Sequence, residues 1–382
     1  MNTSLSFVIY QSVSELPENW DAIAKSTIFL QRDYFKILEQ SCPANMKCFF
    51  IGVFQNNELV GVAISQYLDL NKLESFGERD KCLKTVIRNF IFKRFSSHVL
   101  FLGNCMLTGE NAYTFLDFIP FDEQIKVLYE ARNSIEKILK KEGIRIHLRT
   151  TKDFSKAEIS KINQTSFGSI FQFSTQPNMI FSIPEHWKNE HDYVNALSKK
   201  YRDQYKRARK KAEGVLKHKL SLTEIEQNNE LIYDLYYHVA KNAPFNSFFL
   251  SKNHFTELKK IWKDNFLFYG YFIDDKLIGF NTLIKNGEAM DTYFLGYDDT
   301  IQRDKLLYLN MLYDMIAYSI KKKFKTIIFA RTALEIKSSV GAKPETMYGL
   351  MEHKNPIFNY FLTYFFYYLE PKTVWKKRNP FK

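Results

Sequence analysis

The chain has 382 residues and carries 54 lysine and arginine residues against 42 acidic ones, a formal net charge of +12. This length predicts two domains, and a hydrophobic content of 45% with 25% charged residues excludes a disordered polypeptide. The positive charge favours anionic partners such as nucleotide phosphates, RNA, anionic lipid or an acidic carrier protein, although a high isoelectric point without such a partner is also common.

The N-terminus and the cysteines favour a cytoplasmic protein. Residues 1–20 show no basic segment followed by a long apolar run, and no stretch reaches the roughly 18–20 apolar residues of a spanning helix. We therefore expect a soluble protein or one that is peripheral at the inner membrane face. Reduced thiols and no metal site are expected from the four cysteines, which form no CxxC pair: Cys42, Cys48, Cys82 and Cys105.

The first strong pattern along the chain is a hairpin signature that recurs in the second half. Residues 50–63 read FIGVFQNNELVGVA, and residues 268–281 read FYGYFIDDKLIGFN. The central Asn and Asp pairs tolerate the positive φ of two-residue turns, so each copy predicts two strands joined by a tight turn. Five positions are identical: Phe50/Phe268, Gly52/Gly270, Phe54/Phe272, Leu59/Leu277 and Gly61/Gly279.

The similarity continues downstream of both hairpins. In each half a strand-like run is followed by a helical pattern and a second strand: 101–103, 122–142 and 146–150 in the first, and 294–296, 304–323 and 328–332 in the second. A duplicated domain explains this shared order. We expect an N-terminal domain over 1–170, a C-terminal domain over 171–355 that carries the catalysis, and an aromatic and basic tail over 356–382.

Two segments lie outside the repeat. Residues 196–212 carry eight basic residues and one acidic residue and predict an amphipathic helix, which either packs on the body through its tyrosines or docks a phosphate-rich or acidic partner. Residues 356–369 (PIFNYFLTYFFYYL) are almost wholly apolar and are followed by a basic tail. They suit either an interfacial membrane anchor or a terminal helix that covers the core.

The order of hairpin, strand, long helix and strand resembles the GNAT acyltransferase fold, and more closely its FemAB-like, tandem branch. The resemblance is carried by GYFIDDKLIGF (270–280), DTYFLGY (291–297), EIKSSVGAKPE (335–345) and the basic helix. It implies an α/β protein with two tandem GNAT-like domains, each a mixed central sheet flanked by helices. It also implies an acyltransferase that holds no tight cofactor and takes an acyl donor and an amine acceptor.

The expected phosphate loop departs from the family pattern. In the GNAT family that this chain resembles, enzymes that use acetyl-CoA usually have a glycine-containing loop at the start of the long helix. The backbone amides of that loop hold the pyrophosphate. Here residues 300–310 (TIQRDKLLYLN) contain no glycine, although Gln302 and Arg303 remain as donor-binding candidates. Acyl-CoA or an acyl carrier protein is the expected donor, and aminoacyl-tRNA is the alternative.

The resemblance implies a catalytic centre along residues 291–297. Asp291 and Tyr293 are candidates for base and acid there, with a strand-start role and a sheet-packing role as their alternatives. Glu335 is a third catalytic candidate, because it follows the next strand, where active-site loops of α/β folds gather.

Four further residues are substrate-binding candidates. Arg331 suits a carboxylate or phosphate or else pairs with Glu335, and Lys337 is chosen by resemblance alone. His238 and Asn242 share a helical face one turn apart, and packing is the alternative for the histidine. In the first half, His147 and Arg149 are expected to contact substrate without taking part in catalysis.

The leading hypothesis is an N-acyltransferase that moves an acyl group from a thioester to an amine, such as an amino lipid or a cell-envelope precursor. The alternatives are tRNA-dependent aminoacyl transfer to a peptidoglycan precursor, and a non-catalytic GNAT-like binding module. An anionic membrane surface or an acidic carrier protein is a possible partner, and no DNA binding is expected.

Overall fold

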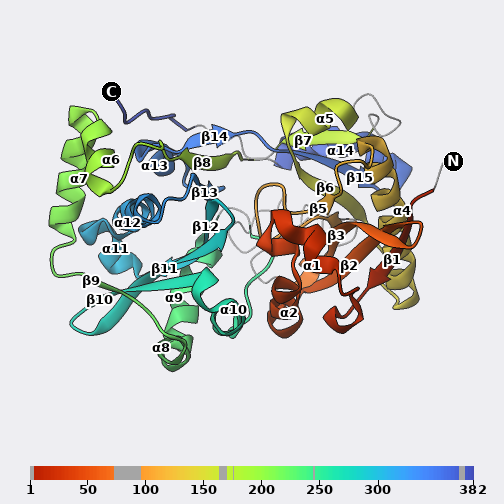
Figure 1. The fold of residues 1–382 in the computed structure, drawn as a ribbon, viewed down its shortest axis with the longest axis horizontal. Coiled ribbons are helices and arrows are strands. Elements are labelled where there is room, and N and C mark those ends of the chain that lie inside the picture. Colours follow the sequence, from red (N-terminus) through yellow and green to blue (C-terminus); the bar gives the residue numbers. More distant parts are fainter. Residues whose placement is uncertain (1–3, 73–95, 163–169, 175, 244–245, 370–374) are drawn as a thin grey trace, which may run out of the picture. The chain divides into compact units, whose positions relative to one another are not determined.

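The computed structural model describes residues 4–72, 96–162, 170–174, 176–243, 246–369 and 375–382. The chain divides into two compact units, each assembled from separate segments (Figure 1). Unit 1 contains Met1–Thr175, Asn246–Ser251 and Thr346–Lys372, and unit 2 contains Gln176–Phe245, Lys252–Glu345 and Thr373–Lys382. The C-terminal residues 356–382 are thus shared between both units.

Unit 1 is built on a mixed sheet. Its strand order is β1-β2-β3-β4-β6-β15-β7, and β5 pairs with β3 beside this path. The β4–β6 pair is parallel and the other pairs are antiparallel. The strands are β1 Ser6–Tyr10, β2 Met46–Gln55, β3 Glu58–Asp69, β4 His98–Leu102, β5 Tyr113–Phe115, β6 Leu148–Phe154, β7 Phe171–Ser174 and β15 Tyr348–His353. The helices are α1 Trp20–Ile23, α2 Arg32–Ser41, α4 Phe121–Lys141, α5 Lys156–Ile162 and α14 Pro356–Leu369.

Unit 2 repeats this plan with strand order β14-β8-β13-β12-β11-β10-β9, in which only the β12–β13 pair is parallel. The strands are β8 Asn178–Ser182, β9 Leu216–Lys219, β10 Phe266–Ile273, β11 Lys276–Asn286, β12 Ala289–Tyr297, β13 Thr326–Ala330 and β14 Lys343–Glu345. The helices are α6 Glu190–Ala196, α7 Lys199–Lys211, α8 Leu222–Gln227, α9 Asn229–Asn242, α10 His254–Trp262, α11 Asp299–Lys305, α12 Leu307–Lys321 and α13 Leu334–Ser339.

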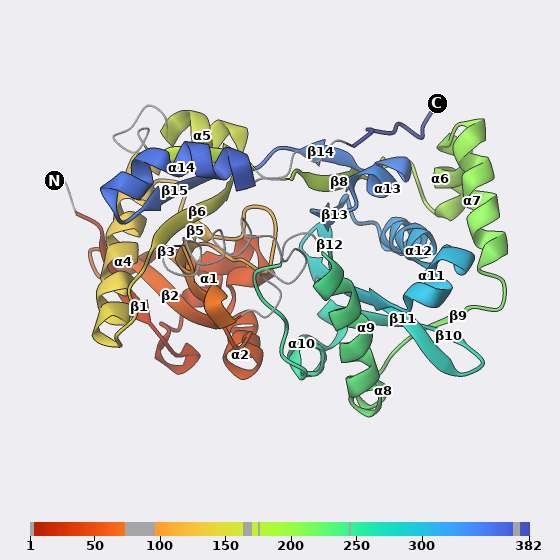
Figure 2. The same cartoon turned by 180° about the vertical axis from the view of Figure 1, so that it is seen from behind.

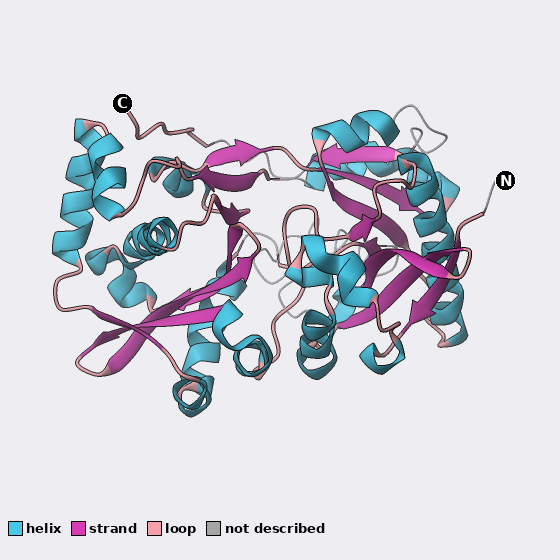
Figure 3. Ribbon diagram, in the orientation of Figure 1, coloured by secondary structure: helices cyan, strands magenta, loops and turns pink. Residues whose placement is uncertain are grey.

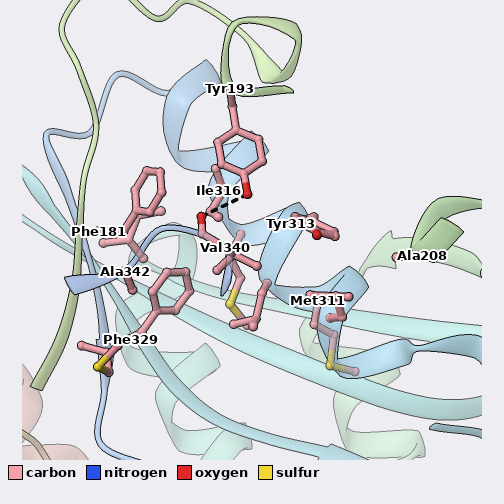
Figure 4. Packing of buried hydrophobic residues seen from close by; sticks show 14 of the residues in the cluster. Phe181, Tyr193, Ala208, Met311, Tyr313, Ile316, Phe329, Val340 and Ala342 are labelled. Atoms are coloured by element: carbon pink, nitrogen blue, oxygen red, sulfur yellow. Dashed lines mark hydrogen bonds between the residues drawn. The ribbon is translucent and has the colours of Figure 1, made fainter. Parts of the chain in front are cut away.

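Helices cover both faces of the unit 2 sheet (Figures 2 and 3). On one face, α12 buries Leu312 and Ile316 against the sheet together with Tyr193 and Ala208 from α6 and α7 (Figure 4). The Tyr193 hydroxyl donates to the carbonyl of Val340 at 3.0 Å, which satisfies this polar group inside the core. On the opposite face, α9 packs against β11 and β12.

The duplicated hairpin is confirmed down to its turn geometry. Asn56 and Asn57 between β2 and β3 have φ of 51° and 67°, and Asp274 and Asp275 between β10 and β11 have 46° and 61°. Each first strand also shifts register at the same aligned place, between Val53 and Phe54 and between Tyr271 and Phe272. The two halves therefore share local backbone irregularities as well as residues.

Two predicted helices differ from the structure in their bounds. The pattern over 304–323 predicts one helix, but Leu306 adopts a left-handed φ of 48° and separates α11 from α12. The basic helix predicted over 196–212 begins at Lys199, because Leu197 and Ser198 are extended between α6 and α7. The helices predicted over 122–142 and 356–369 correspond to α4 and α14. Within the described residues, no helix combines the length and apolarity needed to cross a bilayer.

Candidate functional site

The candidate site lies where two parallel strands of unit 2 separate. The β12–β13 pairing joins 289–291 to 326–328, and β12 then continues to Tyr297 along β11 alone. We call residues 289–297 and 326–331 the strand fork. Against β11 the register shifts between Asn281 and Leu283, so that β12 accommodates an extra residue within the fork. Such a bulge re-aims side chains and opens main-chain groups to a ligand.

Asp291 occupies the last paired position of the fork. Its side chain is buried, and the Asn286 amide donates to its Oδ2 at 3.1 Å. Burial raises the pKa of Asp291 to about 7, and the hydrogen bond from Asn286 offsets part of this rise. A carboxyl group that titrates near neutrality is well matched to accept a proton from an amine.

Tyr293 lies two residues further along β12 and contacts a histidine that the sequence analysis missed. The hydroxyl of Tyr293 and Nε2 of His254 are 2.9 Å apart, and His254 is fully buried at the start of α10. The two residues are 39 positions apart, and no local pattern in the sequence links them. The buried imidazole of His254 can accept a hydrogen bond from the partly exposed phenol of Tyr293 or donate one to it.

Lys337 fixes the end of β13. Its Nζ donates to the carbonyls of Phe329 at 2.6 Å and Arg331 at 2.5 Å, and burial lowers its pKa. The same turn holds Ala330, Thr332 and Ala333 at positive φ, a conformation that costs free energy for residues other than glycine. The Nζ of Lys337 is thus directed at main-chain carbonyls of this turn, and substrate binding by Lys337 stays a prediction.

Glu335 and Arg331 lie close in sequence and contact different parts of the chain. The carboxylate of Glu335 pairs with the guanidinium of Arg378, which lowers the pKa of Glu335. Arg331 contributes its carbonyl to Lys337. The structure therefore joins Arg331 to Lys337 and directs Glu335 to the C-terminal segment.

His238 and Asn242 are neighbours on α9, as predicted. Nε2 of His238 lies 2.5 Å from Oδ2 of Asp299 on α11 and 3.5 Å from Nδ2 of Asn242. Both His238 and Asp299 are about half exposed, so the pair is open to solvent.

The predicted donor residues Gln302 and Arg303 lie on α11. Asp298 is the N-cap of this helix and Asp299 its first residue, and the Asp298 carboxylate accepts from the Thr300 amide at 2.9 Å. Two carboxylates at a helix start disfavour a bound phosphate. The start of α12 is preceded directly by α11, so neither helix offers the glycine-lined phosphate cradle of a CoA-binding loop.

Among the described residues, no group of three or more His, Cys, Asp or Glu side chains is arranged to hold a metal ion. Cys42, Cys48 and Cys105 are free thiols, and Cys82 lies outside the described residues.

Three solved structures share this architecture. FemX superposes with a TM-score of 0.53 at 11% identity, over 96% of this chain and 100% of that one. A tandem GNAT protein from the clavulanic acid biosynthesis pathway gives 0.51 at 9% identity, over 92% and 99%. The C-terminal domain (DUF2156) of a putative lysylphosphatidylglycerol synthetase from Agrobacterium fabrum gives 0.50 at 8% identity, over 95% and 99%.

No family model and no curated protein matches the sequence. At these identities the structural similarity concerns the fold alone. It confirms the predicted fold class: two tandem GNAT-like domains, each with a mixed sheet flanked by helices.

Proposed function

We propose that this tandem GNAT chain is an N-acyltransferase that moves an acyl group from a thioester to an amine at the strand fork of unit 2. The observation that carries the proposal is the position of Asp291 and Tyr293 on β12, where its pairing with β13 ends. The tandem GNAT fold supports the same reaction class, because solved structures with this fold include a tandem GNAT protein from the clavulanic acid biosynthesis pathway and FemX.

The proposed chemistry assigns one proton transfer to each side chain. The amine nitrogen attacks the thioester carbonyl carbon, and Asp291 accepts the proton that the nitrogen loses. Main-chain N–H groups of the bulged β12 stabilise the oxyanion. As the carbon–sulfur bond breaks, Tyr293 protonates the departing sulfur while Nε2–H of His254 donates to the phenolic oxygen. Exchange with solvent then returns Asp291 and Tyr293 to their starting states.

The donor is a thioester carried by coenzyme A or by an acyl carrier protein, bound as a substrate and not as a resident cofactor. The acidic start of α11 argues against tight binding of a nucleotide diphosphate there. Gln302 and Arg303 on α11 remain the proposed donor contacts, and His238 and Asn242 on α9 the proposed acceptor contacts.

The acceptor is proposed to be an amino lipid or a cell-envelope precursor, met by a cytoplasmic protein at the inner membrane face. Helix α14 supports a peripheral site, because Ile357, Tyr360 and Phe361 are 69%, 82% and 47% exposed. Aromatic side chains of this kind favour a membrane–water interface.

Aminoacyl transfer from tRNA is the second candidate, favoured by the exposed cations of α7. RNA affinity that falls steeply with salt and depends on Lys199, Lys200, Arg202 and Arg207 is its expected signature.

The direct test incubates the purified full chain with acyl-CoA, acyl-pantetheine or aminoacyl-tRNA and a panel of amines, and detects amides by mass spectrometry. Asp291→Asn should lower kcat/KM by about 10²–10⁴-fold, the usual contribution of a general base. In the wild type, kcat/KM should rise with pH through about 7, where Asp291 loses its proton.

Asp304→Asn, which removes an exposed carboxylate on α11, is the matched control and should leave activity unchanged. A wild-type chain that forms no amide from any thioester donor would contradict the proposal. Amide formation from aminoacyl-tRNA alone would favour the second candidate.

A further inference from the structure

A pair of thiols lies where α2 leads into β2 in unit 1. Sγ of Cys42, which directly follows α2, is 3.8 Å from Sγ of Cys48 on β2. A disulfide requires a sulfur–sulfur distance of about 2.05 Å, so a closing movement of about 2 Å separates this contact from a bond. Both side chains are partly exposed, and a small oxidant in solvent can therefore reach them.

The loop between the two cysteines is folded back on itself by a turn. The Met46 amide donates to the carbonyl of Pro43 at 2.9 Å, which closes a β-turn inside the loop. The Cys42 thiol donates to the carbonyl of Met46 at 3.6 Å. The folded backbone, and not only the short separation in sequence, thus brings the two sulfur atoms together.

The side chain of Gln66 fixes the sulfur of Cys48. Gln66 lies directly opposite Cys48 on β3, and its Nε2 donates to Cys48 Sγ at 3.6 Å. The side chain of Gln66 is buried, and its Oε1 accepts from the Cys105 amide at 2.6 Å. Both ends of this side-chain amide are engaged, so Cys48 is held in position before any reaction.

The two thiols have different roles in an oxidation. The hydrogen bond with Cys42 and burial raise the pKa of the Cys48 thiol. The thiolate is the form that attacks an oxidant. We therefore expect Cys42 to react first and Cys48 to act as the resolving thiol.

The same loop holds a segment of unit 1 that is distant in sequence. Nδ2 of Asn45, midway between the cysteines, donates to the carbonyl of Ser247 at 3.0 Å. Oγ of Ser251 donates to the carbonyl of Ser41, the last residue of α2, at 2.8 Å. Residues 246–251 belong to unit 1 and lead into α10. A cross-link within the loop is therefore transmitted to this segment through two hydrogen bonds.

We propose that Cys42 and Cys48 form a modification site, in which peroxide produces an intramolecular disulfide that tightens the hold on residues 246–251. The Cys42 sulfur attacks hydrogen peroxide and becomes a sulfenic acid, and its proton leaves with hydroxide as water. The Cys48 sulfur then attacks the Cys42 sulfur, and the hydroxyl group leaves with the Cys48 proton as a second water.

This reaction is balanced by the peroxide alone. The two thiols lose two electrons, and hydrogen peroxide takes up these electrons and is reduced to water. Thiol–disulfide exchange with glutathione restores both thiols. None of these steps involves an acyl donor, so the reaction is independent of the proposed acyl transfer.

Peptide mapping of the full chain detects the cross-link directly. Trypsin cleaves after Lys47, between the two cysteines, so the disulfide joins the peptides 37–47 and 48–72. After the native protein is treated with hydrogen peroxide and its remaining thiols are alkylated, we expect the joined peptides as the main product. Glutathione should separate them. Cys105→Ser, which removes another partly exposed thiol, is the matched control and should give the same joined peptides.

Hydrogen exchange measures the effect on the held segment. In the oxidised wild type, exchange along residues 246–251 should slow by about twofold or more, because a cross-linked loop opens less often. Cys42→Ser and Cys48→Ser cannot form the bond, so peroxide should leave their exchange along this segment unchanged. Circular dichroism of each variant shows whether its fold is retained.

Three results would overturn the proposal. The first is oxidation of either cysteine to a sulfinic acid without a cross-link. The second is a disulfide that involves Cys105 or joins two chains, which a non-reducing gel would show as a dimer. The third is a Cys42–Cys48 disulfide that leaves exchange along residues 246–251 unchanged, because the loop would then not transmit the cross-link.

Discussion

The buried carboxyl group of Asp291 makes the strand fork sensitive to pH in its stability as well as in its chemistry. Burial raises the pKa of this group from 3.8 to about 7, so the folded chain holds the proton more tightly than the unfolded chain does. Its stabilising contribution is therefore complete below about pH 4 and is lost as the pH rises through 7.

Asp291→Asn removes this dependence. Between about pH 4 and pH 8, the free energy of unfolding of the wild type should fall relative to that of the variant by up to about 4 kcal/mol. Urea denaturation of both proteins across this range measures the difference. Parallel stability curves for wild type and variant would show that the carboxyl is not buried as described.

The glycine, leucine and phenylalanine residues shared by the two hairpins pack against one another in the same way in both copies. A Cβ on Gly52 would lie 3.2 Å from Leu59, and a Cβ on Gly270 would lie 3.1 Å from Leu277. The ring of Phe54 lies beside Gly52 in the first copy, and the ring of Phe272 lies beside Gly270 in the second. The turn residues, the glycine and the aromatic residue all lie within a segment of fourteen positions. Because these signals are local, the sequence is sufficient to predict both hairpins.

At the level of elements, the close approach of α9 to β12 depends on Gly296. A Cβ at this position would lie 2.6 Å from main-chain atoms of Leu235 and Tyr236, and 2.5 Å from the ring of Phe280. Gly296→Ala should therefore displace α9 and destabilise the chain by about 1–3 kcal/mol, as overpacking does.

Thermal unfolding monitored by circular dichroism measures this loss. The control is Gly287→Ala, at a turn with φ of 58° and no neighbour within 4 Å, which should cost only about 1 kcal/mol through backbone strain. Equal losses for both variants would contradict the packing argument.

A charge network docks the C-terminal strand β15 onto unit 1. The carboxylate of Glu352 pairs with the buried Arg132 of α4 and lies 3.5 Å from Nη1 of Arg149 on β6. Glu352→Gln leaves Arg132 buried without its counter-charge, so we expect a loss of about 3–5 kcal/mol. Glu345→Gln, at an exposed carboxylate of β14, should have little effect on the same urea denaturation curve.

The break between α11 and α12 and the Tyr293–His254 contact show where sequence reasoning failed. Leu306 adopts a left-handed conformation that leucine disfavours, so the apolar stripe over 304–323 predicts one continuous helix. His254 reaches Tyr293 only because α10 packs beside β10 and β12 in the folded unit. Neither feature follows from the spacing of apolar residues along the sequence.

At the scale of the whole molecule, the chain closes each unit with segments that are distant in sequence. Strand β15 enters the unit 1 sheet between β6 and β7, about 200 residues after its partner β6. Hydrophobic patterning predicts strands but not such partners. The sequence therefore predicts two domains, but only the structure shows that residues 346–372 belong to unit 1.

The last residues close unit 2 in the same manner. Phe381 packs against Phe181 and Tyr193 with ring centroids 6.3 and 6.1 Å apart, and the Ser198 amide donates to the carbonyl of Pro380 at 2.8 Å. A Cβ on Gly341 would lie 2.6 Å from the Phe381 ring, so the glycine makes room for it.

Removal of residues 375–382 should destabilise unit 2 by about 3–5 kcal/mol, the usual cost of losing a packed phenylalanine. Hydrogen exchange should accelerate at Ser198 and along residues 338–342, which these residues contact. Protection of β6 and β15 in unit 1 should remain, because their pairing involves none of the deleted residues. Faster exchange throughout both units would instead mean that the two units unfold as one, and unchanged exchange at Ser198 would mean that the tail does not hold the start of α7.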